Sequence, residues 1–306
     1  MATLRSTLPD LYLSRLAFLE EVLFDWMPIE DAVSEKLLKV RDMGNRPMLR
    51  TTTVASFGTV PIKAEGSNVA YDDLAMGQDK TYQADTYELA FTASKEAIDD
   101  EQEEVVSDAA RALGSSMMYT VEVDMANLFN LGFATQAGSV DGVALYTTAH
   151  PLVGGGTGAN AMGTSADLSV SALRDALNSI IDTVDDVGKL VHWRPKVLLV
   201  PGELQWLAHE LVDSPDRPDT SDRAINAFKK ADGGQLSVVV WPYLTDSDAW
   251  FLMASPEEHN VRKYWRERPN VMHDWDFESS AMKVKIRARW IKGHSDWRGT
   301  WGSAGA

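Results

Sequence analysis

The feature of this chain that most limits its possible folds is one long, uninterrupted helical pattern. Residues 94–133 contain no proline, and apolar residues recur every three or four positions, at Ile98, Val105, Ala109, Leu113, Met117, Val121, Met125 and Leu128. This spacing places them on one face of an α-helix. At 1.5 Å per residue the helix would span roughly 50–60 Å, and it would far exceed the globular average of about 11 residues. A helix of this length suits a subunit that neighbouring copies complete.

The segment before this helix predicts a long β-hairpin. Residues 51–64 are rich in Thr and Val, which favour extended backbone, and a polar tip follows from Gly66 to Gly77. The chain returns through residues 80–92, where apolar and polar side chains alternate. An isolated two-stranded hairpin is only marginally stable in water. We therefore expect this one to lie against another surface, either a neighbouring subunit or its own domain.

The rest of the chain predicts an N-terminal arm and a compact α/β unit. Residues 8–27 carry an incomplete leucine stripe with few partners nearby, so we expect a helical arm that lies across another subunit. From residue 168 onward, short helical and strand patterns alternate. The predicted helices are residues 173–181, 203–212 and 224–230, and the predicted strands are residues 196–200, 238–240 and 249–253.

The C-terminal segment predicts further strands. Residues 282–290 alternate between apolar and basic side chains, which indicates a half-buried strand with one basic face. We expect it to pair with strands near residues 249–265 and to flank the long helix. Its basic face either pairs with the acidic block at residues 96–104, or both faces are simply solvated. Seven of the ten Trp lie between Trp241 and Trp301, as in a domain core or an interface.

Composition excludes several classes of function. The 306 residues include no Cys, which excludes disulfides, thiolate metal sites and Cys nucleophiles. There is no apolar run of eighteen residues and no basic-then-apolar N-terminal segment, so we expect neither a transmembrane helix nor a secretory signal. The net charge of −16 argues against an outer surface that grips nucleic acid. It is compatible with an acidic container that holds DNA without trapping it on the wall.

No motif offers a catalytic, cofactor-binding or metal-ligating set of residues. The Gly-rich loop at residues 154–158 is followed by Ala and Asn, where a phosphate-binding loop has Lys and Ser or Thr. His209 begins a near miss of the zinc-binding His-Glu-x-x-His motif, with Asp213 at the second His position. The six His show no ligand spacing, and two acidic pairs lack a calcium loop: Asp246 with Asp248, and Asp274 with Asp276. We therefore expect neither enzyme activity nor a cofactor.

Taken in order, the arm, hairpin, spine-like helix, α/β unit and β-rich return resemble the major capsid proteins of tailed bacteriophages, which have the HK97-like fold. Residues 87–100 (YELAFTASKEAIDD) look like the family's passage from its extended loop into its spine helix. Residues 195–204 (PKVLLVPGEL) and 249–253 (AWFLM) look like parts of its α/β domain. The closing residues 296–302 (DWRGTWG) are similar to the ends of Mu-like head proteins.

The resemblance implies an α+β fold in four parts. These are an N-terminal arm (1–50), an extended loop or E-loop over an adjacent subunit (51–92), a peripheral P-domain with the spine helix (93–164 and 249–306), and an axial A-domain (165–248). Head-to-tail contacts that close into rings would give hexamers and pentamers. Some members of the family form Lys–Asn cross-links. Lys63 and Lys80 lie in the expected loop, but no acceptor is identifiable.

The resemblance also implies a function, which is to form the icosahedral head of a phage around double-stranded DNA, without sequence-specific binding. Assembly would occur in the host cytoplasm, away from membranes, and would involve a portal, scaffolding and, where the head uses them, decoration proteins. Because the chain begins almost directly with the arm, we expect any scaffolding to come from a separate protein. Three alternatives remain open: an encapsulin-like nanocompartment, a tail or adhesin-type protein, and a metal-dependent hydrolase that uses His209.

Overall fold

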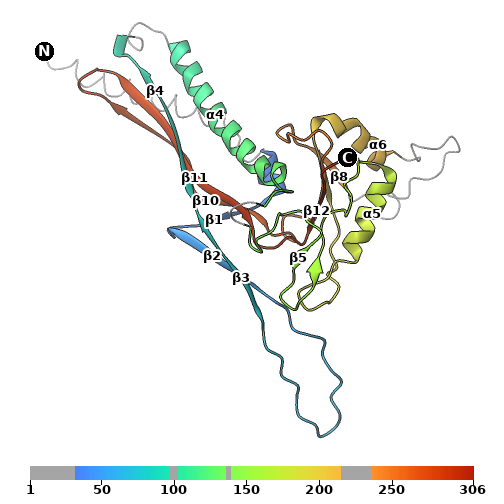
Figure 1. Ribbon diagram of the computed structural model, residues 1–306. Helices are drawn as coiled ribbons and strands as arrows, with labels where there is room; N and C mark the ends of the chain where they lie inside the picture. The colour runs from blue at the N-terminus through green and yellow to red at the C-terminus, as the bar shows by residue number, and fades with distance from the viewer. Residues whose placement is uncertain (1–31, 97–102, 136–138, 215–235) are drawn as a thin grey trace.

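The computed structural model describes residues 32–96, 103–135, 139–214 and 236–306. The predicted helices at residues 8–27 and 224–230 lie outside these ranges. The described chain has an elongated arm built from one long helix and long strands, a compact α/β part, and a loop that projects from the region where the two join (Figure 1).

The long helix is α4 (Glu103–Asn130), whose 28 residues span about 42 Å. The predicted apolar stripe is confirmed from Leu113 onward, where Leu113, Met117, Val121, Met125 and Leu128 are all buried. The helix ends three residues before the predicted position. Gly132 follows that end, and its N–H donates to the Phe129 carbonyl. A Cβ on Gly132 would lie 2.7 Å from the Tyr146 ring, so only Gly lets the chain pass this ring.

A four-stranded sheet packs against α4, in the order β1-β10-β11-β4. Its strands are β1 (Lys39–Asp42), β10 (Val261–Trp275), β11 (Met282–His294) and β4 (Asp85–Ala93). The alternation predicted for β11 is confirmed, because Met282, Val284, Ile286, Ala288 and Trp290 are buried. β11 pairs with β10, which includes residues 261–265 of the expected partner region, and on its other side with β4.

A second four-stranded sheet forms the α/β part, in the order β12-β9-β7-β8. Its strands are β12 (Thr300–Ser303), β9 (Trp250–Met253), β7 (Val197–Val200) and β8 (Ser237–Val240), and its helices are α5 (Val170–Ile181), η2 (Gly202–Leu204) and α6 (Gln205–Asp213). The predicted elements in the described part of this unit are confirmed. However, β9 and β12, which the resemblance placed with the P-domain, pair inside this sheet.

The Gly-rich loop closes a small hairpin between β5 (His150–Pro151) and β6 (Thr157–Gly158). Gly155 and Gly156 have φ angles of 90° and 89°, a left-handed region that side chains disfavour. The glycines therefore serve a tight turn.

The projecting hairpin pairs β2 (Met48–Val54) with β3 (Met76–Gln83), and residues 55–75 between them form an irregular loop. The hairpin is shorter than the sequence predicts, because residues 85–93 belong to β4 and pair with β11. There Tyr87 stacks on Trp290, with ring centres 3.8 Å apart and planes at 4°. The alternation in this segment fits a half-buried strand but does not identify its partner.

The N-terminal segment also differs from its prediction over its described part. Helix α2 (Val33–Leu37) and β1 pack on their own chain, and β1 extends the sheet parallel to β10. Glu35 accepts a hydrogen bond from the buried Lys263 ammonium at 2.7 Å and another from the Trp265 indole at 3.0 Å. Burial lowers the pKa of Lys263, and the Glu35 carboxylate opposes this shift. Residues 33–42 therefore complete their own subunit.

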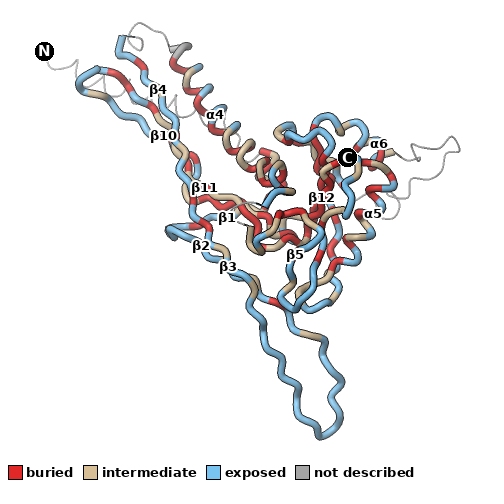
Figure 2. Tube along the Cα trace, in the orientation of Figure 1, coloured by how far each residue is buried: buried red, intermediate tan, exposed pale blue. Residues whose placement is uncertain are grey.

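Buried residues run along the facing surfaces of α4 and β11 and through the second sheet, whereas the projecting loop is almost entirely exposed (Figure 2). Five Trp are fully buried, namely Trp241, Trp250, Trp265, Trp290 and Trp301. The Trp-rich C-terminal region thus supplies the core of the subunit.

Candidate assembly surfaces

The hairpin loop, residues 55–75, exposes apolar side chains along its length. Val60, Ile62 and Tyr71 are at least 95% exposed, and Phe57, Val69 and Leu74 are more than half exposed. Few contacts hold the loop together. Ala55 N–H donates to the Ala75 carbonyl at 2.9 Å, and Gly58 N–H donates to the Asp72 carboxylate at 2.7 Å. Exposed apolar surface of this kind is typical of interaction sites, so the loop is a candidate assembly surface.

The root of the same hairpin is firmly anchored. Tyr82 on β3 is buried, lies 5.4 Å from the Tyr264 ring, and donates from its hydroxyl to the His294 carbonyl at 2.6 Å. Gly293 makes room for this ring, because a Cβ there would lie 2.4 Å from it. The loop is therefore fixed at one end and unsupported at the other.

Two further exposed apolar groups lie at the remaining ends of the molecule (Figure 1). Phe277, at the turn between β10 and β11, is 97% exposed, and Trp206 on α6 is 79% exposed. The β10–β11 turn is well ordered by Asp276, whose carboxylate accepts from Glu278 N–H at 3.1 Å and from Lys283 at 2.6 Å. The hydrogen bond from Lys283 is the main reason that the pKa of Asp276 falls to about 2.

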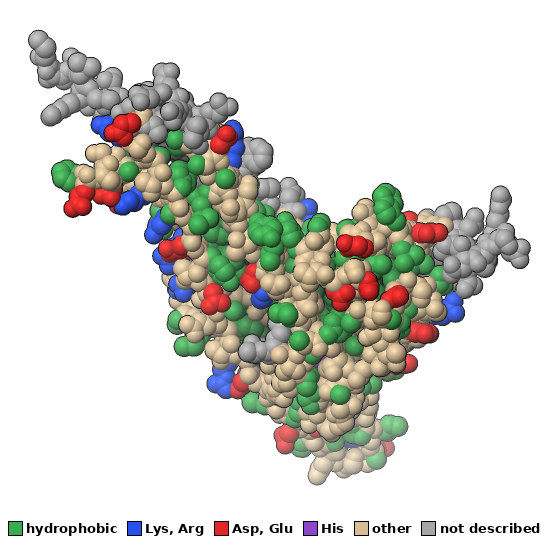
Figure 3. Space-filling model, turned by 45° about the horizontal axis from the view of Figure 1, so that its top comes forward, with side chains coloured by type: hydrophobic (Ala, Val, Ile, Leu, Met, Phe, Trp, Pro, Cys, Tyr) green, Lys and Arg blue, Asp and Glu red, His purple; other side chains and the backbone are tan. Residues whose placement is uncertain are grey.

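Charge is distributed unevenly over the surface. In Figure 3 Lys and Arg lie along the edge of the long arm, while Asp and Glu predominate around the α/β part. The basic face of β11 is paired by its neighbouring strands: Arg287 lies 3.2 Å from Glu88 on β4 and 3.3 Å from Glu267 on β10. The acidic block proposed as its partner lies mostly outside the described residues.

The motifs examined for chemistry are scattered over the fold. His209 and Asp213 form an exposed pair on α6, 2.7 Å apart. Within the described ranges, no three His, Asp or Glu side chains lie close enough to hold a metal ion. The carboxylates of Asp246 and Asp276 accept from the N–H two residues further on, a contact that is typical of turns. No described helix combines the length and hydropathy needed to cross a membrane.

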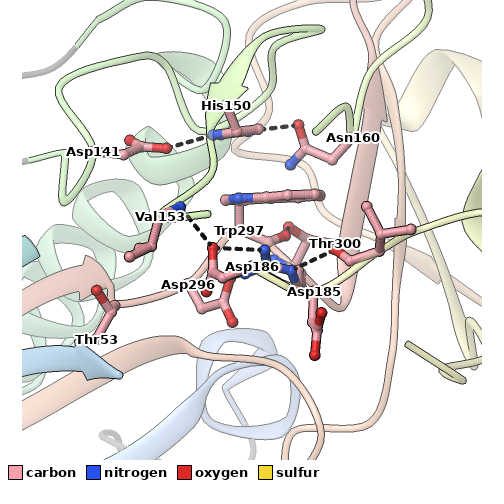
Figure 4. Close-up of polar contacts among 12 residues, drawn as sticks. Thr53, Asp141, His150, Val153, Asn160, Asp185, Asp186, Asp296, Trp297 and Thr300 are labelled. Atoms are coloured by element: carbon pink, nitrogen blue, oxygen red, sulfur yellow. Dashed lines mark hydrogen bonds and ion pairs between the residues drawn. The ribbon is translucent and has the colours of Figure 1, made fainter. Parts of the chain in front are cut away.

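A polar cavity of about 510 Å³ lies between the hairpin root and the segment after β11. The hairpin contributes residues 51–54 and 76–78, and the opposite wall includes Asp141, Asp186 and residues 294–298. Beside it, His150 is fully buried between Asp141 and Asn160 (Figure 4). Sequence spacing did not reveal this cluster, because its members come from segments as distant as Asp141 and Trp297. No local motif could have found it.

The comparisons with known proteins agree with this architecture. The capsid of cyanophage P-SCSP1u superposes with a TM-score of 0.57 at 10% identity, covering 90% of this chain and 88% of that one. A protein of Microbacterium phage Oxtober96 gives 0.55 at 13% identity, with 90% and 91% covered. The virus-like particle from Pyrococcus furiosus gives 0.51 at 10% identity, with 95% and 99% covered. No curated protein matches the chain.

Sequence and fold together place the chain in one family. Its fold is the α+β, HK97-like fold of phage capsids, as the resemblance implied. The family described as phage capsid protein matches residues 77–302, which include most of β3, all of α4, every strand of the first sheet except β1, and the second sheet up to residue 302. The narrower likeness to Mu-like head proteins stays a prediction. The chain belongs to the phage capsid protein family.

Proposed function

We propose that this chain is the major capsid protein of a tailed phage, which assembles into hexamers and pentamers of an icosahedral head around double-stranded DNA. The observation that carries the proposal is the hairpin loop, because Val60, Ile62 and Tyr71 are at least 95% exposed and the described part of their own subunit does not bury them. Burying an apolar side chain of this size contributes about 1.5–3 kcal/mol. A neighbouring copy that covers the loop would supply that burial.

Each part of the subunit has a proposed role. The segment 51–92 acts as the E-loop, although its strand β4 is also part of the sheet under α4. The long arm with α4 forms the peripheral P-domain, and the α/β part forms the axial A-domain. Head-to-tail contacts close into rings, and many modest contacts act together to hold the shell.

The proposed partners follow from this role. Other copies of the chain are the main partner, and a portal, scaffolding and decoration proteins complete the virion, which assembles in the host cytoplasm. With a net charge of −16, the shell would enclose DNA without gripping it. The family and fold are those of structural shell proteins, and we propose that the chain catalyses no reaction.

A substitution in the hairpin loop tests the proposal. Replacing Val60, Ile62 and Tyr71 together by Ser should leave a folded subunit that fails to form rings or shells in electron micrographs. The matched control replaces Lys63 and Glu65 by Ser, which changes two exposed loop residues and keeps the net charge. The control should assemble normally. Normal shells from the triple variant would overturn the bridging role of the loop.

A second candidate is an encapsulin-like shell of the same fold. The likeness to the virus-like particle from Pyrococcus furiosus, which covers 95% of this chain, favours it. Particles isolated from the native source separate the two, because a phage head contains double-stranded DNA, whereas a nanocompartment contains protein cargo. Particles filled with protein and free of DNA would favour this second function.

A further inference from the structure

The first sheet ends at β4 on one side, where the strand lies beside β11 (Figure 1). β11 pairs with one edge of β4 through nine consecutive residue pairs, and no strand in the described part of the chain pairs with the other edge. Of the nine residues of β4, only Ala93 is buried. The open edge of such a strand presents N–H and C=O groups that can pair with a further strand.

The opposite edge of the same sheet is protected against such addition. β1 covers only residues 262–265 of β10. Beyond Trp265 the register of β10 against β11 shifts twice, between Trp265 and Glu267 and between Glu267 and Asn270. Pro269, which has no N–H to donate, lies in the second of these irregular stretches. Bulges and proline are features by which natural edge strands avoid pairing with another chain.

Strand β4 has none of these features. Its sequence, DTYELAFTA, contains no Pro, Gly, Lys or Arg, and its pairing with β11 shows no register shift. The two Thr, the Tyr and the Phe are residues that favour strands. One edge of the sheet therefore resists a further strand, whereas the other can accept one.

Leu89, at the middle of β4, is an apolar side chain that the described part of the chain leaves half exposed. Because side chains alternate along a strand, Leu89 lies on the same face of the sheet as Tyr87 and Phe91. Tyr87 stacks on Trp290 at 3.8 Å, and both Tyr87 and Phe91 pack against the buried core. Leu89 lies between them, yet 52% of it remains exposed. A strand added at the β4 edge would cover it.

The charges on β4 limit what that added strand can be. Its two charged residues, Asp85 and Glu88, are both acidic, and Glu88 lies 3.2 Å from Arg287 on β11. Like charges directly opposite one another destabilise a pair of strands, whereas paired aromatic residues and paired Thr stabilise it. The added strand should therefore place no carboxylate opposite Asp85 or Glu88.

A second copy of β4 meets this condition when the two strands run antiparallel about Leu89. In this register all nine residues of both strands are paired, and no two charged residues lie directly opposite. The pairs are Leu89 with Leu89, Tyr87 with Phe91, Thr86 with Thr92, Glu88 with Ala90, and Asp85 with Ala93. The two Glu88 carboxylates become diagonal neighbours, and each keeps its own Arg287. A register centred one residue earlier would place them directly opposite each other.

We propose that the outer edge of β4 is an interaction surface for a second copy of this chain, paired antiparallel about Leu89. The pairing joins two four-stranded sheets into one, by the addition of a strand to an open edge. Because both copies use the same strand, two copies satisfy the edge and leave no place for a third. In the proposed shell, this contact would join adjacent rings, since contacts within a ring are head to tail. Only that consequence rests on the proposed function.

Disulfide trapping tests the register, because the chain contains no Cys and one substitution supplies the only thiol. Under mild oxidation Leu89→Cys should give a covalent dimer on a non-reducing gel, since directly opposite residues of antiparallel strands have Cβ atoms about 4.5–5.5 Å apart. Met272→Cys, an exposed position on the irregular part of β10, is the matched control and should remain a single chain. No dimer from Leu89→Cys, or an equal yield from both variants, would overturn the proposal.

Charge substitution tests the same pair without a covalent bond. Leu89→Lys alone and Leu89→Glu alone each place two like charges opposite each other at the centre, so neither should pair. A mixture of the two variants places Lys opposite Glu and should restore pairing. The measurement is hydrogen exchange at residues 85–93. We expect the amides that do not bond to β11 to exchange roughly tenfold more slowly in concentrated than in dilute protein whenever the strands pair.

The dependence on concentration separates the possible occupants of this edge. Equal protection at every concentration would mean that the chain covers the edge itself. Protection that persists in Leu89→Lys and in Leu89→Glu alone would mean another register or another partner. Either result, or a mixture that fails to restore pairing, would overturn the proposal.

The same exchange measurement separates this proposal from the role of the hairpin loop. With Val60, Ile62 and Tyr71 replaced by Ser in the full-length chain, β4 should still pair, because the loop takes no part in the contact. Lost shells with β4 pairing intact would then concern the loop alone. Shells that form without any protection of β4 would contradict the pairing proposed here and leave the proposed function standing.

Discussion

The hairpin loop and the Trp-rich core both contain large apolar side chains, but the loop exposes them and the core buries them. Ile62 in the loop is wholly exposed, whereas Trp241, Trp265 and Trp290 are fully buried. Each of these three indoles also donates its N–H to a carboxylate, on Glu122, Glu35 and Asp124 respectively. These three indoles therefore find both their apolar and their polar contacts within one chain.

The loop has few of these supports, and its large apolar side chains have none. Only its first and last residues, Ala55 and Ala75, continue the pairing of the hairpin, and no described helix or strand covers its apolar side chains. The difference teaches that apolar content does not by itself show where a core lies. It shows where burial would be favourable, and under the proposed function a neighbouring copy supplies that burial for the loop.

The largest effect on the subunit itself is expected in the core. Trp290→Ala should lower the free energy of unfolding by about 3–5 kcal/mol, because it leaves a cavity against Tyr87. Urea unfolding of the unassembled chain measures this. The control Trp206→Ala removes the exposed indole on α6 and should change stability by no more than about 0.5 kcal/mol. Equal losses of unfolding free energy in the two variants would show that the buried indole does not stabilise the subunit more than the exposed one does.

A somewhat smaller loss is expected at the buried ion pair that holds α2. Glu35→Ala leaves the Lys263 ammonium buried without its carboxylate, which should cost about 3 kcal/mol. Adding Lys263→Met should recover most of that loss in the same unfolding measurement. Asp42→Ala, which removes an exposed contact with Arg268 at 3.7 Å, serves as the control. No recovery in the double variant would show that the pair does not act by charge.

The hairpin root should be more sensitive than its tip. Gly293→Ala places a methyl group 2.4 Å from the Tyr82 ring and should cost about 1–3 kcal/mol by displacing it. Thermal unfolding measures the loss, and assembly should weaken with it. Gly163→Ala, where nothing lies within 4 Å, is the matched control. If Gly293→Ala unfolded at the same temperature as the unaltered chain, Tyr82 would not anchor the root of the hairpin.

The smallest effect on the isolated subunit is expected in the loop. Ile62→Ala should alter the free energy of unfolding by less than about 0.5 kcal/mol, because the side chain is wholly exposed. Its effect should appear instead in assembly, where the threshold concentration rises roughly tenfold if about 1.4 kcal/mol is lost per contact. Light scattering against protein concentration measures this. If Ile62→Ala instead lowered the free energy of unfolding and left the threshold concentration for assembly unchanged, the side chain would stabilise its own subunit and not a contact between subunits.

Local patterns predicted the elements that depend on local periodicity. Helix α4 and strand β11 follow from the spacing of apolar residues. The end of α4 and both ends of β11 were predicted to within four residues, whereas the predicted start of the helix lies nine residues before Glu103. The resemblance rested on the order of such elements, and this order was enough to indicate the fold. The short strands of the α/β unit were recognisable because each is a compact apolar run.

Pairing between distant segments could not be predicted in the same way. Residues 85–93 have the alternation of a hairpin strand, yet their partner is β11, some two hundred residues away. Strand β9 likewise joins the second sheet through β7 and β12. The cluster around His150 is harder still, since Asp141, Asn160 and Trp297 come from different segments of the chain. Such features arise only when the folded chain brings these groups together.

Strands β3 and β4 are separated by one residue, Ala84, although they belong to different sheets. Any force applied to the loop therefore passes straight along the backbone into β4. That strand is held to β11 by nine consecutive residue pairs whose hydrogen bonds lie across the direction of pull. A force exerted by a neighbouring subunit of the proposed shell is thus distributed as shear over the whole strand. Under shear the hydrogen bonds between β4 and β11 must break together and cannot break one after another.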